Sequence, residues 1–443
     1  MVNVGILGKG GREQAFTWKI AQSELVNKVY CLSGNGGTAA IKNAENITGV
    51  GELDFNAILK EIRHHRIDHV IIGPEAPLEK GIVEFLDEEG IICSAPTKAA
   101  SKLEWSKLFA KDVMAEVGIP IARYKATNSI TCITDYISET VDSCGGVVIK
   151  DDALAAGKGV TVCRITDFPK SYGDAQRKEA TIIEAYKAIE DITKKKHVVL
   201  AEEMLVGPEF SFIGVTDGKT FLPLLPSEDY KRVFDHDKGP NTGSMGSLTP
   251  TPIVTDEINT QMCIYAERLI AKMKRRGTAY KGIIYFGCIK TSDGVKVLEI
   301  NARGGDPETQ STLPLLEGDL YKILHASATE QLDKVESEFE WRHGAACCVV
   351  LASGGYPGEY KKGYVINGLE KLVDRKDALV FCAGVQRLGD GTVVTDGGRV
   401  VDIVGIGPNT KAAVKNAYSA LKGVRFGHMH YRTDIGHRAL DMV

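Results

Sequence analysis

The chain has 443 residues, of which 43% are hydrophobic and 25% are charged, and its formal net charge is −4. This length allows two to four domains, and the charge balance disfavours binding to nucleic acid or to a membrane surface. No window of about 18 apolar residues predicts a membrane span. The 10 cysteines lack a C-x-x-C pair, and the chain starts with a strand pattern rather than an export signal. We therefore expect a cytoplasmic protein with reduced thiols.

Residues 1–96 alternate between strand and helix patterns. The predicted helices begin within Gly8–Glu13 and cover Asp54–His64 and Ile82–Glu89, and the predicted strands are Val2–Leu7, Val29–Leu32, His69–Ile72 and Ile92–Ser94. Such alternation predicts a parallel, doubly wound sheet that binds ligands at the carboxyl ends of its strands.

Three loops of this region would then line one crevice. Gly8–Gly11 offers backbone N–H groups at a helix N-terminus, and these suit a phosphate. The second strand ends in Ser33–Asn35, without the acidic residue that binds a ribose hydroxyl in dinucleotide sites. A small phosphorylated ligand is therefore favoured over a nicotinamide cofactor. Glu75, in the Gly-Pro loop after the third strand, would bind a sugar hydroxyl or an amine, or would be a surface turn residue.

The middle of the chain begins with one predicted helix from Thr97, its N-cap, to about Val117. A small unit follows from Arg123 to about His197, with strands near Val147–Lys150 and Val160–Cys163 and a helix over Ala175–Thr193. The glycine-rich stretch between its strands carries Lys158. It fails the Walker pattern, but such a hairpin could fold over phosphates as a lid.

Two further segments suggest binding sites. Val198–Glu209 is a strand that ends in a turn with a following acid, which suits an adenine, with Glu209 on the ribose hydroxyls. Met204 and Leu205 could face the base or belong to the core. Asp229–Gly246 is a long polar loop, and loops of this length are usually functional.

The carboxyl-terminal part has a different pattern, with short strands and one last helix after about residue 332. This pattern predicts a small α+β domain built from Ala345–Leu351, Leu379–Val385, Thr392–Thr395, Val400–Ile406 and the helix Asn409–Leu421.

The most chemically dense stretch is Glu299–Gln310, which follows the predicted strand Val295–Leu298. It offers amide, guanidinium and carboxylate groups, and these hold magnesium and anionic oxygens together. The groups belong to Asn301, Arg303 and the acids Glu299, Asp306 and Glu308. A polar turn after a buried strand is the alternative interpretation.

Five motifs in order give the chain a resemblance to ATP-grasp ligases, and specifically to the phosphoribosylamine–glycine ligase family of purine synthesis. They are Gly8–Glu13, Gly73–Leu78, Leu154–Gly159, Gly239–Gly243 and Gly305–Gln310. The chain departs from the family pattern at Gly304, where an apolar residue is usual, at Asp151–Ala153 of the lid, and at Ser244, where a second glycine is usual. Asp151 would add negative charge near the phosphates, and Gly304 would leave Arg303 less firmly held.

The resemblance implies an α/β fold class with three domains. These are an N-terminal doubly wound parallel-sheet domain that binds phosphoribosylamine (residues 1–104), an ATP-grasp domain (105–331) with a lid subdomain at about 123–197, and a C-terminal α+β domain (332–443). The implied reaction is ATP-dependent ligation of glycine to 5-phosphoribosylamine through a glycyl phosphate, giving glycinamide ribonucleotide, ADP and phosphate. Catalysis would consist of positioning and charge neutralisation.

The resemblance also implies a role for each motif residue. Arg303, Asp306 and Lys150 would be catalytic, and Glu299 and Asn301 would ligate Mg²⁺ or Mn²⁺. The implied ATP ligands are Lys111, Lys150, Lys158, Glu202, Glu203, Met204, Leu205 and Glu209. The implied substrate ligands are Gly10, Gly11, Arg12, Asn35, Gly36, Glu75, Lys231, Arg232, Asp235, Asn241, Thr242, Arg303, Asp306, Pro307 and Glu308.

The implied partners are small molecules only, with no nucleic acid or membrane, and the chain would be a monomer or a weak homodimer. Three alternatives stay open: another purine-pathway ATP-grasp enzyme (a carboxylase or a formate-using enzyme), an NAD-dependent oxidoreductase, and a non-catalytic nucleotide sensor. The Gly305–Gln310 run argues against another ATP-grasp enzyme, and the missing acid after the second strand argues against an oxidoreductase. The departures at Asp151, Ala153 and Gly304 favour the nucleotide sensor.

Overall fold

The computed structural model describes residues 1–154 and 159–442, and its contacts divide the chain into two compact units. Unit 1 contains Met1–Ser101, Phe210–Tyr285 and the chain from Asn301 onward, and unit 2 contains Lys102–Glu209 and Phe286–Ile300. The predicted ATP ligand Lys158 lies outside the described residues. Within the described part of the chain, no helix has the length and apolar character that a bilayer crossing needs.

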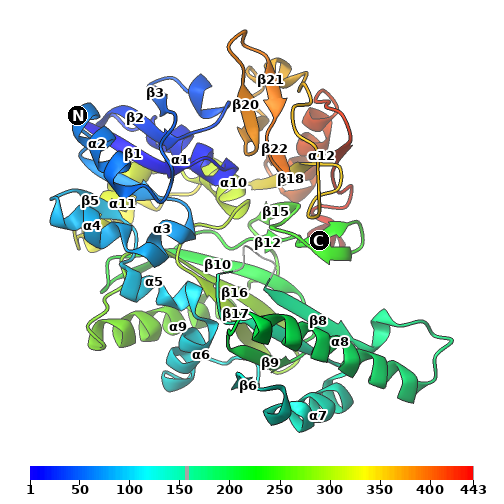
Figure 1. Ribbon diagram of the computed structural model, residues 1–443. Helices are drawn as coiled ribbons and strands as arrows, with labels where there is room; N and C mark the ends of the chain where they lie inside the picture. Colours follow the sequence, from blue (N-terminus) through cyan, green and yellow to red (C-terminus); the bar gives the residue numbers. More distant parts are fainter. Residues whose placement is uncertain (155–158, 443) are drawn as a thin grey trace. The chain divides into compact units, whose positions relative to one another are not determined.

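The N-terminal part of unit 1 is a five-stranded parallel sheet in the order β3-β2-β1-β4-β5 (Figure 1). All four residues of β4 are buried, as expected for a strand covered on both faces. The predicted doubly wound sheet is therefore confirmed. The strands are β1 (Val2–Gly8), β2 (Val26–Ser33), β3 (Ala44–Ile47), β4 (His69–Ile72) and β5 (Ile92–Ser94), and the helices are α1 (Gly11–Ile20), α2 (Phe55–His65), α3 (Glu75–Lys80) and α4 (Ile82–Glu88).

The sequence suggested that Glu75 is a loop residue, but it is the first residue of α3. Pro74 is the N-cap, and Pro77 lies in the first turn, where a missing N–H costs no helical hydrogen bond. The helix therefore starts directly after β4 and holds Glu75 at the carboxyl end of the sheet.

The C-terminal part of unit 1 is an antiparallel sheet in the order β12-β15-β18-β22-β19, with β23 paired to β18. Every residue of β18 is buried, and α12 packs against β18 and β22. Asn409 caps α12 as predicted, by accepting a hydrogen bond from the Ala412 N–H (2.9 Å). The elements are β12 (Glu228–Asp229), β15 (Gly246–Thr249), β18 (Ala345–Ser353), β19 (Ala378–Cys382), β22 (Arg399–Gly407), β23 (Met429–His430), α12 (Thr410–Leu421) and α13 (His437–Asp441).

Two β-hairpins lie where the sequence predicted a loop and a single strand. Asp229–Gly246 is not a plain loop, because β13 (Arg232–Phe234) and β14 (Lys238–Asn241) pair within it. His236 and Asp237 take positive φ angles of 59° and 52°, as tight hairpin turns require. The single strand predicted over Leu379–Val385 is also wrong. β19 ends at Cys382, and β20 (Val385–Arg387) pairs with β21 (Val393–Thr395) in a separate hairpin.

A four-stranded sheet in the order β11-β10-β16-β17 consists of β11 (Phe221–Pro223), β10 (Glu209–Thr216), β16 (Gly282–Thr291) and β17 (Gly294–Asn301). β17 continues three residues beyond the predicted end at Leu298, so Glu299 and Asn301 are strand residues rather than turn residues. The remaining helices of unit 1 are α9 (Asp256–Arg275), α10 (Glu308–Thr312) and α11 (Leu320–Ala328).

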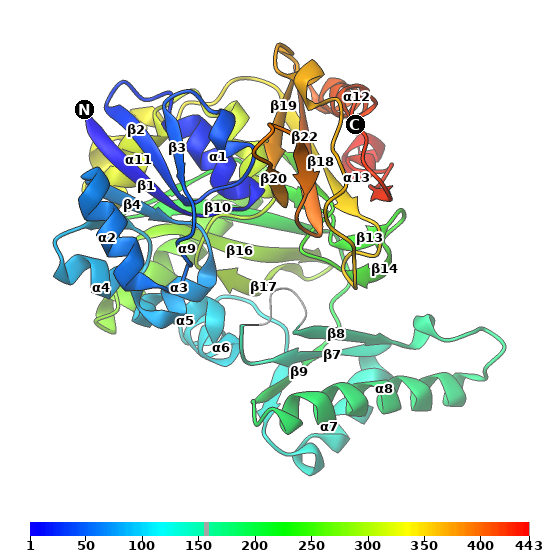
Figure 2. The ribbon, with the colours of Figure 1, turned by 45° about the horizontal axis from the view of Figure 1, so that its top comes forward.

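The main part of unit 2 is an antiparallel sheet in the order β6-β9-β7-β8, with α7 and α8 on one side (Figure 2). A buried core that includes Ile137, Ile149 and Ile189 joins these helices to the sheet. The elements are β6 (Tyr124–Thr127), β7 (Gly146–Asp151), β8 (Val160–Arg164), β9 (Val199–Glu203), α7 (Thr134–Cys144) and α8 (Asp174–Lys194).

The single helix predicted over Thr97–Val117 is wrong, because the chain breaks it at Ser106 into α5 (Lys98–Trp105) and α6 (Lys107–Glu116). Ser106 has extended backbone angles, and its hydroxyl accepts a hydrogen bond from the Phe109 N–H (3.2 Å). Serine competes well for this capping role and is a poorer helix-interior residue. Asp152 adds a second cap by accepting from the Leu108 N–H (2.9 Å).

Candidate functional site

A buried cluster of lysines lies in unit 2. Lys111 on α6 and Lys150 on β7 place their ammonium groups 3.0 and 3.1 Å from the same Glu202 oxygen, and Lys150 also donates to the Leu298 carbonyl (3.1 Å). Burial lowers the pKa of Lys111 to about 8, against the opposing effect of Glu202. Lys107 lies on the same helix, and burial lowers its pKa too. Two buried cations share one carboxylate, so the cluster has a positive excess that suits an anion.

Glu202 and Glu203 point to opposite faces of β9, because side chains alternate along a strand. Glu203 accepts hydrogen bonds from Arg123 Nε (2.7 Å) and Lys296 Nζ (2.9 Å). Burial raises its pKa, but these bonds outweigh burial and lower the pKa to about 2. Glu203 is therefore a structural anion, whereas the buried Oε1 of Glu202 has no hydrogen-bond partner among the described residues. The predicted adenine ligands Met204 and Leu205 are half-buried in the segment after β9, and the predicted ribose ligand Glu209 is the half-buried first residue of β10.

The departure at Asp151 is compensated inside unit 2. The buried Asp151 carboxylate lies 2.8 Å from His197 Nδ1 and 3.7 Å from Lys195 Nζ. Its charge therefore faces a histidine and a lysine, whereas the sequence led us to expect added negative charge near the phosphates.

Glu299 and Asn301 fit a magnesium ion. They are two residues apart on β17, so both side chains emerge on one face of the strand. Both are half-buried oxygen donors, and Mg²⁺ typically takes one or two such protein ligands and completes its shell with substrate phosphates and water. Residue 287 beside Glu299 is a glycine, and a Cβ there would lie 3.0 Å from Glu299 Cγ, so the glycine leaves this carboxylate its room.

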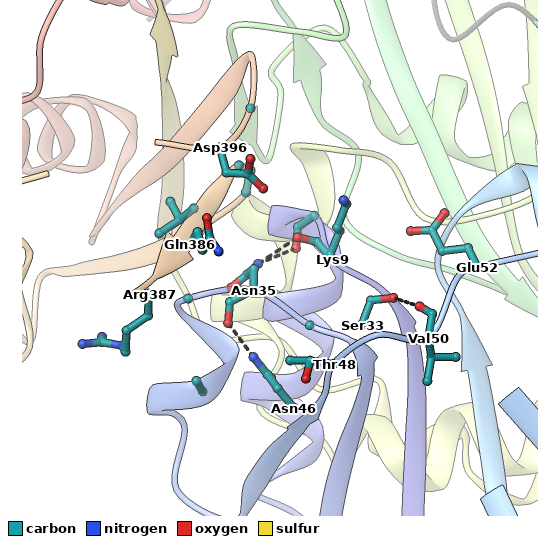
Figure 3. A pocket seen from close by; sticks show the side chains of 18 of the residues that line it. Lys9, Ser33, Asn35, Asn46, Thr48, Val50, Glu52, Gln386, Arg387 and Asp396 are labelled. Atoms are coloured by element: carbon teal, nitrogen blue, oxygen red, sulfur yellow. Dashed lines mark hydrogen bonds between the residues drawn. The ribbon is translucent and has the colours of Figure 1, made fainter. Parts of the chain in front are cut away.

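A cavity of about 1430 Å³ lies in unit 1 (Figure 3). Its walls come from the loops after β1, β2 and β3 on one side and from the β20–β21 hairpin on the other. The wall contains four cationic side chains, Lys9, Lys362, Arg387 and Arg399. The acids of the wall are Glu52, Asp54, Asp306 and Asp396, and Asp396 is paired with Lys362 (3.1 Å). Of the predicted substrate ligands, Gly10, Asn35, Gly36 and Asp306 line this cavity.

Asn35 has internal partners for its whole side chain. Its amide nitrogen donates to the Lys9 and Cys382 carbonyls (2.9 and 2.7 Å), and its oxygen accepts from the Gly37 and Thr38 N–H groups. Asn35 therefore ties the loop after β2 to the loop after β1 and to β19. Gly36 packs against β20, where a Cβ would come within 2.9 Å of a Val385 methyl group.

The start of α1 is faced by carboxylates, which differs from the expectation of a free phosphate cradle. The Gly10 N–H donates to Glu13 Oε2 (2.7 Å), and a Cβ on Gly11 would lie 2.0 Å from Asp402 Oδ2. Arg12 is buried between Glu13 Oε1 (2.6 Å) and the Gly304 carbonyl (3.1 Å). Arg12 thus joins the first motif loop to the stretch that contains Arg303.

Arg303 forms an ion pair with Glu75 (Nε to Oε2, 3.0 Å), so the structure brings two predicted site residues together. Burial raises the pKa of Glu75, but Arg303 and Arg12 outweigh burial and lower it. Gly304 does not leave Arg303 loose, because Glu75 holds it. A Cβ on Gly304 would lie 2.8 Å from Thr309 Oγ1 and 3.1 Å from a Phe16 ring carbon, so the apolar residue usual in the family would not fit here.

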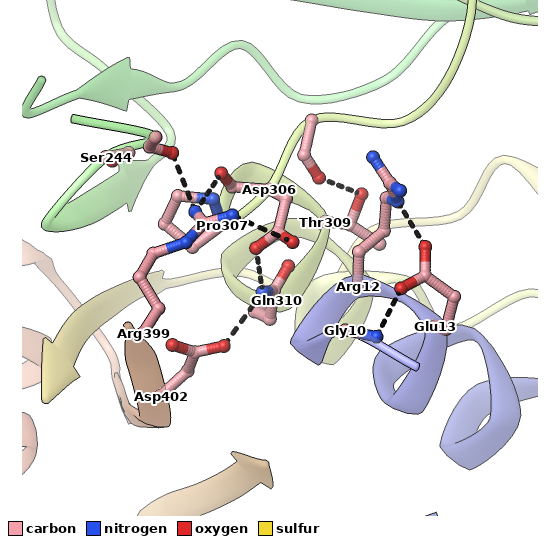
Figure 4. Close-up of polar contacts among 12 residues, drawn as sticks. Gly10, Arg12, Glu13, Ser244, Asp306, Pro307, Thr309, Gln310, Arg399 and Asp402 are labelled. Carbon is pink, nitrogen blue, oxygen red and sulfur yellow. Dashed lines mark hydrogen bonds and ion pairs between the residues drawn. The ribbon is translucent and has the colours of Figure 1, made fainter. Parts of the chain in front are cut away.

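Asp306 belongs to a second cluster at the cavity (Figure 4). Its carboxylate accepts from Gln310 Nε2 (2.7 Å) and pairs with Arg399 (3.3 Å), and Gln310 Nε2 also donates to Asp402 Oδ2 (2.9 Å). Burial raises the pKa of Asp306, but the guanidinium groups of Arg399 and Arg12 lower it below its usual value.

The remaining predicted substrate ligands have mainly internal contacts. Glu308 is buried and accepts from Ser211 Oγ (2.8 Å), and the Pro307 carbonyl accepts from Ser247 Oγ (3.0 Å). In the β13–β14 hairpin, Arg232 donates to the Gly239 carbonyl and is the register partner of Asn241. Thr242 donates to the Lys231 carbonyl. Asp235 accepts from Thr433.

Comparison with known proteins places this chain among ligases. The family models described as phosphoribosylglycinamide synthetase match residues 2–104 (N domain), 105–309 (ATP-grasp domain) and 346–438 (C domain). The phosphoribosylamine–glycine ligase of Nostoc sp. is 39% identical over 447 residues, covering 99% of each chain. That of Caldanaerobacter subterraneus is 40% identical and covers 98% of this chain and 99% of its own. This chain belongs to the phosphoribosylamine–glycine ligase family.

Solved structures agree with the membership in the phosphoribosylamine–glycine ligase family. The ligase of Thermotoga maritima is 31% identical, with a TM-score of 0.77 over 98% of this chain and all of that one. The biotin carboxylase domain of Hydrogenobacter thermophilus 2-oxoglutarate carboxylase, solved with MgADP, is 16% identical with a TM-score of 0.70 and shares the fold. The predicted fold class, with its N-terminal parallel sheet, ATP-grasp domain and C-terminal α+β domain, is confirmed.

Four residues of these clusters were not predicted from the sequence: Lys107, Gln310 as a linking residue, Arg399 and Asp402. Asp402 left a signal, because it is an acid within the apolar run Val400–Ile406, and acids are rarely buried without a partner. Arg399 and Lys107 left none, since a charged residue at a strand or helix start is ordinary.

Proposed function

We propose that this chain is an ATP-dependent ligase that joins glycine to 5-phosphoribosylamine, giving glycinamide ribonucleotide, ADP and phosphate in the purine biosynthetic pathway. The observation that carries the proposal is the match to all three domain models of one ligase family, together with near-complete coverage of relatives of that name. The ion pair between Arg303 and Glu75 supports it, because it joins two of the five motifs on which the resemblance rests.

The ATP phosphates bind the lysine cluster of unit 2. Lys111 and Lys150 supply the buried positive excess, and Lys158 is proposed as a third cation on the sequence alone. Glu202, Met204 and Leu205 hold the adenine and Glu209 the ribose. Glu299 and Asn301 would hold Mg²⁺ or Mn²⁺, which when bound would supply positive charge beside the phosphates. The biotin carboxylase domain that shares this fold was solved with MgADP bound, which supports the assignment.

Phosphoribosylamine binds in the cavity of unit 1. Lys9 and Arg387 are the cations of the wall that serve its phosphate, because Lys362 is paired with Asp396 and Arg399 with Asp306. A volume of about 1430 Å³ exceeds the usual range for one small ligand, so the cavity has room for the sugar phosphate and ordered water. Asn35, Arg12 and Glu13 position the cavity loops rather than contact the phosphate.

In the first half-reaction, a glycine carboxylate oxygen attacks the γ-phosphorus of ATP, and ADP leaves. Arg303 stabilises the negative charge on the transferring phosphoryl group. In the second, the amine nitrogen bonds to the glycyl carbon, the carbon–oxygen bond to phosphate breaks, and phosphate leaves with the electron pair. The amine releases one proton, for which the anionic Asp306 carboxylate at the cavity wall is an acceptor.

Isotope transfer tests this sequence of steps. With glycine labelled by ¹⁸O in its carboxylate, each turnover transfers one labelled oxygen to inorganic phosphate, because the oxygen that attacked phosphorus leaves with it. Mass spectrometry of the phosphate measures the transfer. Unlabelled phosphate from a reaction that consumes glycine would contradict the acyl phosphate route.

The proposed domain boundaries are near residues 104 and 331, with a lid subdomain at about 123–197. The protein works in the cytoplasm, for which the free state of all ten cysteines is support. It acts as a monomer or a weak homodimer on small-molecule substrates.

A further inference from the structure

Asp402 is a buried acid that the reaction described above does not use. It lies on β22 with 1% of its surface exposed, and it does not line the cavity. Its Oδ2 accepts a hydrogen bond from Gln310 Nε2, and its Oδ1 has no hydrogen-bond partner among the described residues. The Oε1 of the fully buried Gln310 also lacks a partner there. Two buried acceptors without a donor are costly, and a proton on Asp402 would turn one of them into a donor.

Gln310 links Asp402 to the cavity. One amide nitrogen donates to both Asp306 Oδ1 (2.7 Å) and Asp402 Oδ2 (2.9 Å), so two carboxyl groups share a single donor (Figure 4). The bond to Asp402 therefore decides how the Gln310 amide faces Asp306, which does line the cavity.

The surroundings of the two carboxyl groups are unequal. The groups that face Asp402 are Asp306 before α10, Arg399 on its own strand, Cys348 on β18 and Cys382 on β19, and α1 presents Gly11. Burial raises the pKa of both thiols, so they are neutral. Arg399 lies 3.3 Å from Asp306 and thus favours the anion there, whereas the charge on Asp306 disfavours a second anion at Asp402.

We propose that Asp402 is a positioning residue that works as a neutral carboxylic acid, and that through Gln310 it keeps Asp306 the single anionic carboxylate of this cluster at the cavity. This proposal rests on the proposed function, because the contact between Asp306 and the amine substrate is part of that function. When Asp402 loses its proton, a second buried negative charge repels Asp306 and competes for the Gln310 amide. The substrate then meets a displaced Asp306.

The test compares the wild type with Asp402→Asn, which is neutral at every pH and keeps an acceptor for Gln310. Burial and the charge of Asp306 raise the pKa of Asp402 to about 7. We therefore expect the kcat/KM for phosphoribosylamine of the two proteins to agree within about threefold at pH 6, and the variant to exceed the wild type by about tenfold at pH 8.5. Taking the ratio at each pH removes ionisations that both proteins share. Asp374→Asn, on an exposed residue, is the control and follows the wild type.

A second measurement does not depend on catalysis. A carboxyl group whose folded pKa is raised stabilises the fold below its ordinary pKa of 3.8, and this stability is lost as pH rises through about 7. The variant lacks this group, so its Tm relative to the wild type should rise between pH 5 and pH 8. Equal pH profiles, or a Tm difference that is constant with pH, would overturn the inference. If the wild type ligates no glycine, the proposed function fails, and the Tm series still decides the state of Asp402.

Discussion

The cations proposed to bind the anionic substrates are each held by a carboxylate. Lys111 and Lys150 share Glu202, and Arg303 is held against Glu75. In each case a cation is kept in place by a carboxylate and is available to a ligand of higher charge. Such preorganised charges contribute more in a buried site than in water, because little reorganisation is needed when the substrate arrives.

ATP binding near pH 8 should be coupled to proton uptake by Lys111. Burial lowers the pKa of its ammonium to about 8, and an added polyphosphate raises that pKa again. At pH 8 we expect ATP binding to be accompanied by the uptake of as much as ~0.5 proton more in the wild type than in Lys111→Arg, because the arginine charge does not titrate. Affinity for ATP should weaken as pH rises through this pKa. Calorimetry in buffers of different ionisation enthalpy measures the uptake, and equal values for both proteins would refute this role of Lys111.

Replacing Arg303 by alanine should lower kcat/KM by about 100-fold, the effect of removing one charge partner of the transition state. The control is Arg63→Ala, which removes an exposed arginine paired with Glu89 elsewhere in unit 1 and should leave kcat/KM within about twofold of the wild type. Steady-state kinetics of the purified variants decide the matter. Equal losses in both would mean that Arg303 acts on the fold alone.

At this scale the sequence predicted motif residues better than their partners. Arg303, Asp306 and Glu75 were proposed as site residues because they lie in short motifs of unusual composition. That Asn35 and Arg12 use their side chains within the protein could not be predicted, because their partners, such as Cys382 and Gly304, are hundreds of residues away. Hydrogen bonds of that sequence separation follow from packing and leave no local pattern.

Short elements decide where these charges lie. The break at Ser106 starts a new helix, α6, whose first turns carry Lys107 and Lys111. Asp152, at the start of the lid loop, caps this helix through the Leu108 N–H. The loop proposed to cover ATP and the helix proposed to bind its phosphates are therefore coupled by one carboxylate.

Asp152→Ala should remove that coupling. We expect a loss of about 1 kcal/mol in unfolding free energy, the usual effect of removing an N-cap, and a rise of several-fold in the KM for ATP with little change in the KM for glycine. Asn409→Ala removes the cap of α12 and is the matched control, with a similar loss of stability and an unchanged KM for ATP. Denaturant unfolding and kinetics of both variants test this. An unchanged KM for ATP in Asp152→Ala would show that the cap does not position α6 for the nucleotide.

Apolar or clearly capped elements were predictable and short polar ones were not. The strands Val2–Leu7 and His69–Ile72 and the helix after Asn409 follow clear periodicity and capping signals. The β13–β14 hairpin was interpreted as a loop because polar and charged residues dominate it, and its turn uses His236 and Asp237 rather than glycine. β3 was missed because its four residues contain a single strongly apolar one, Ile47.

The whole molecule combines widely separated parts of the chain. In unit 1, β12 and β15 from the middle of the sequence complete the C-terminal sheet, and Gln14 on α1 accepts a hydrogen bond from the Cys382 N–H on β19 (2.7 Å). The cavity likewise takes its walls from the first hundred residues and from the β20–β21 hairpin. The family models match residues 2–104, 105–309 and 346–438, so the parts of the chain joined in this way belong to one family.

The most direct test of the central claim is ADP release by the purified wild type, with phosphoribosylamine generated in place and glycine added or withheld. We predict ADP release that requires both substrates and that matches the glycinamide ribonucleotide formed. ADP release of equal rate without glycine, or with bicarbonate or formate in its place, would contradict the account and favour another ATP-grasp activity, and no ADP release under any of these conditions would favour a nucleotide sensor.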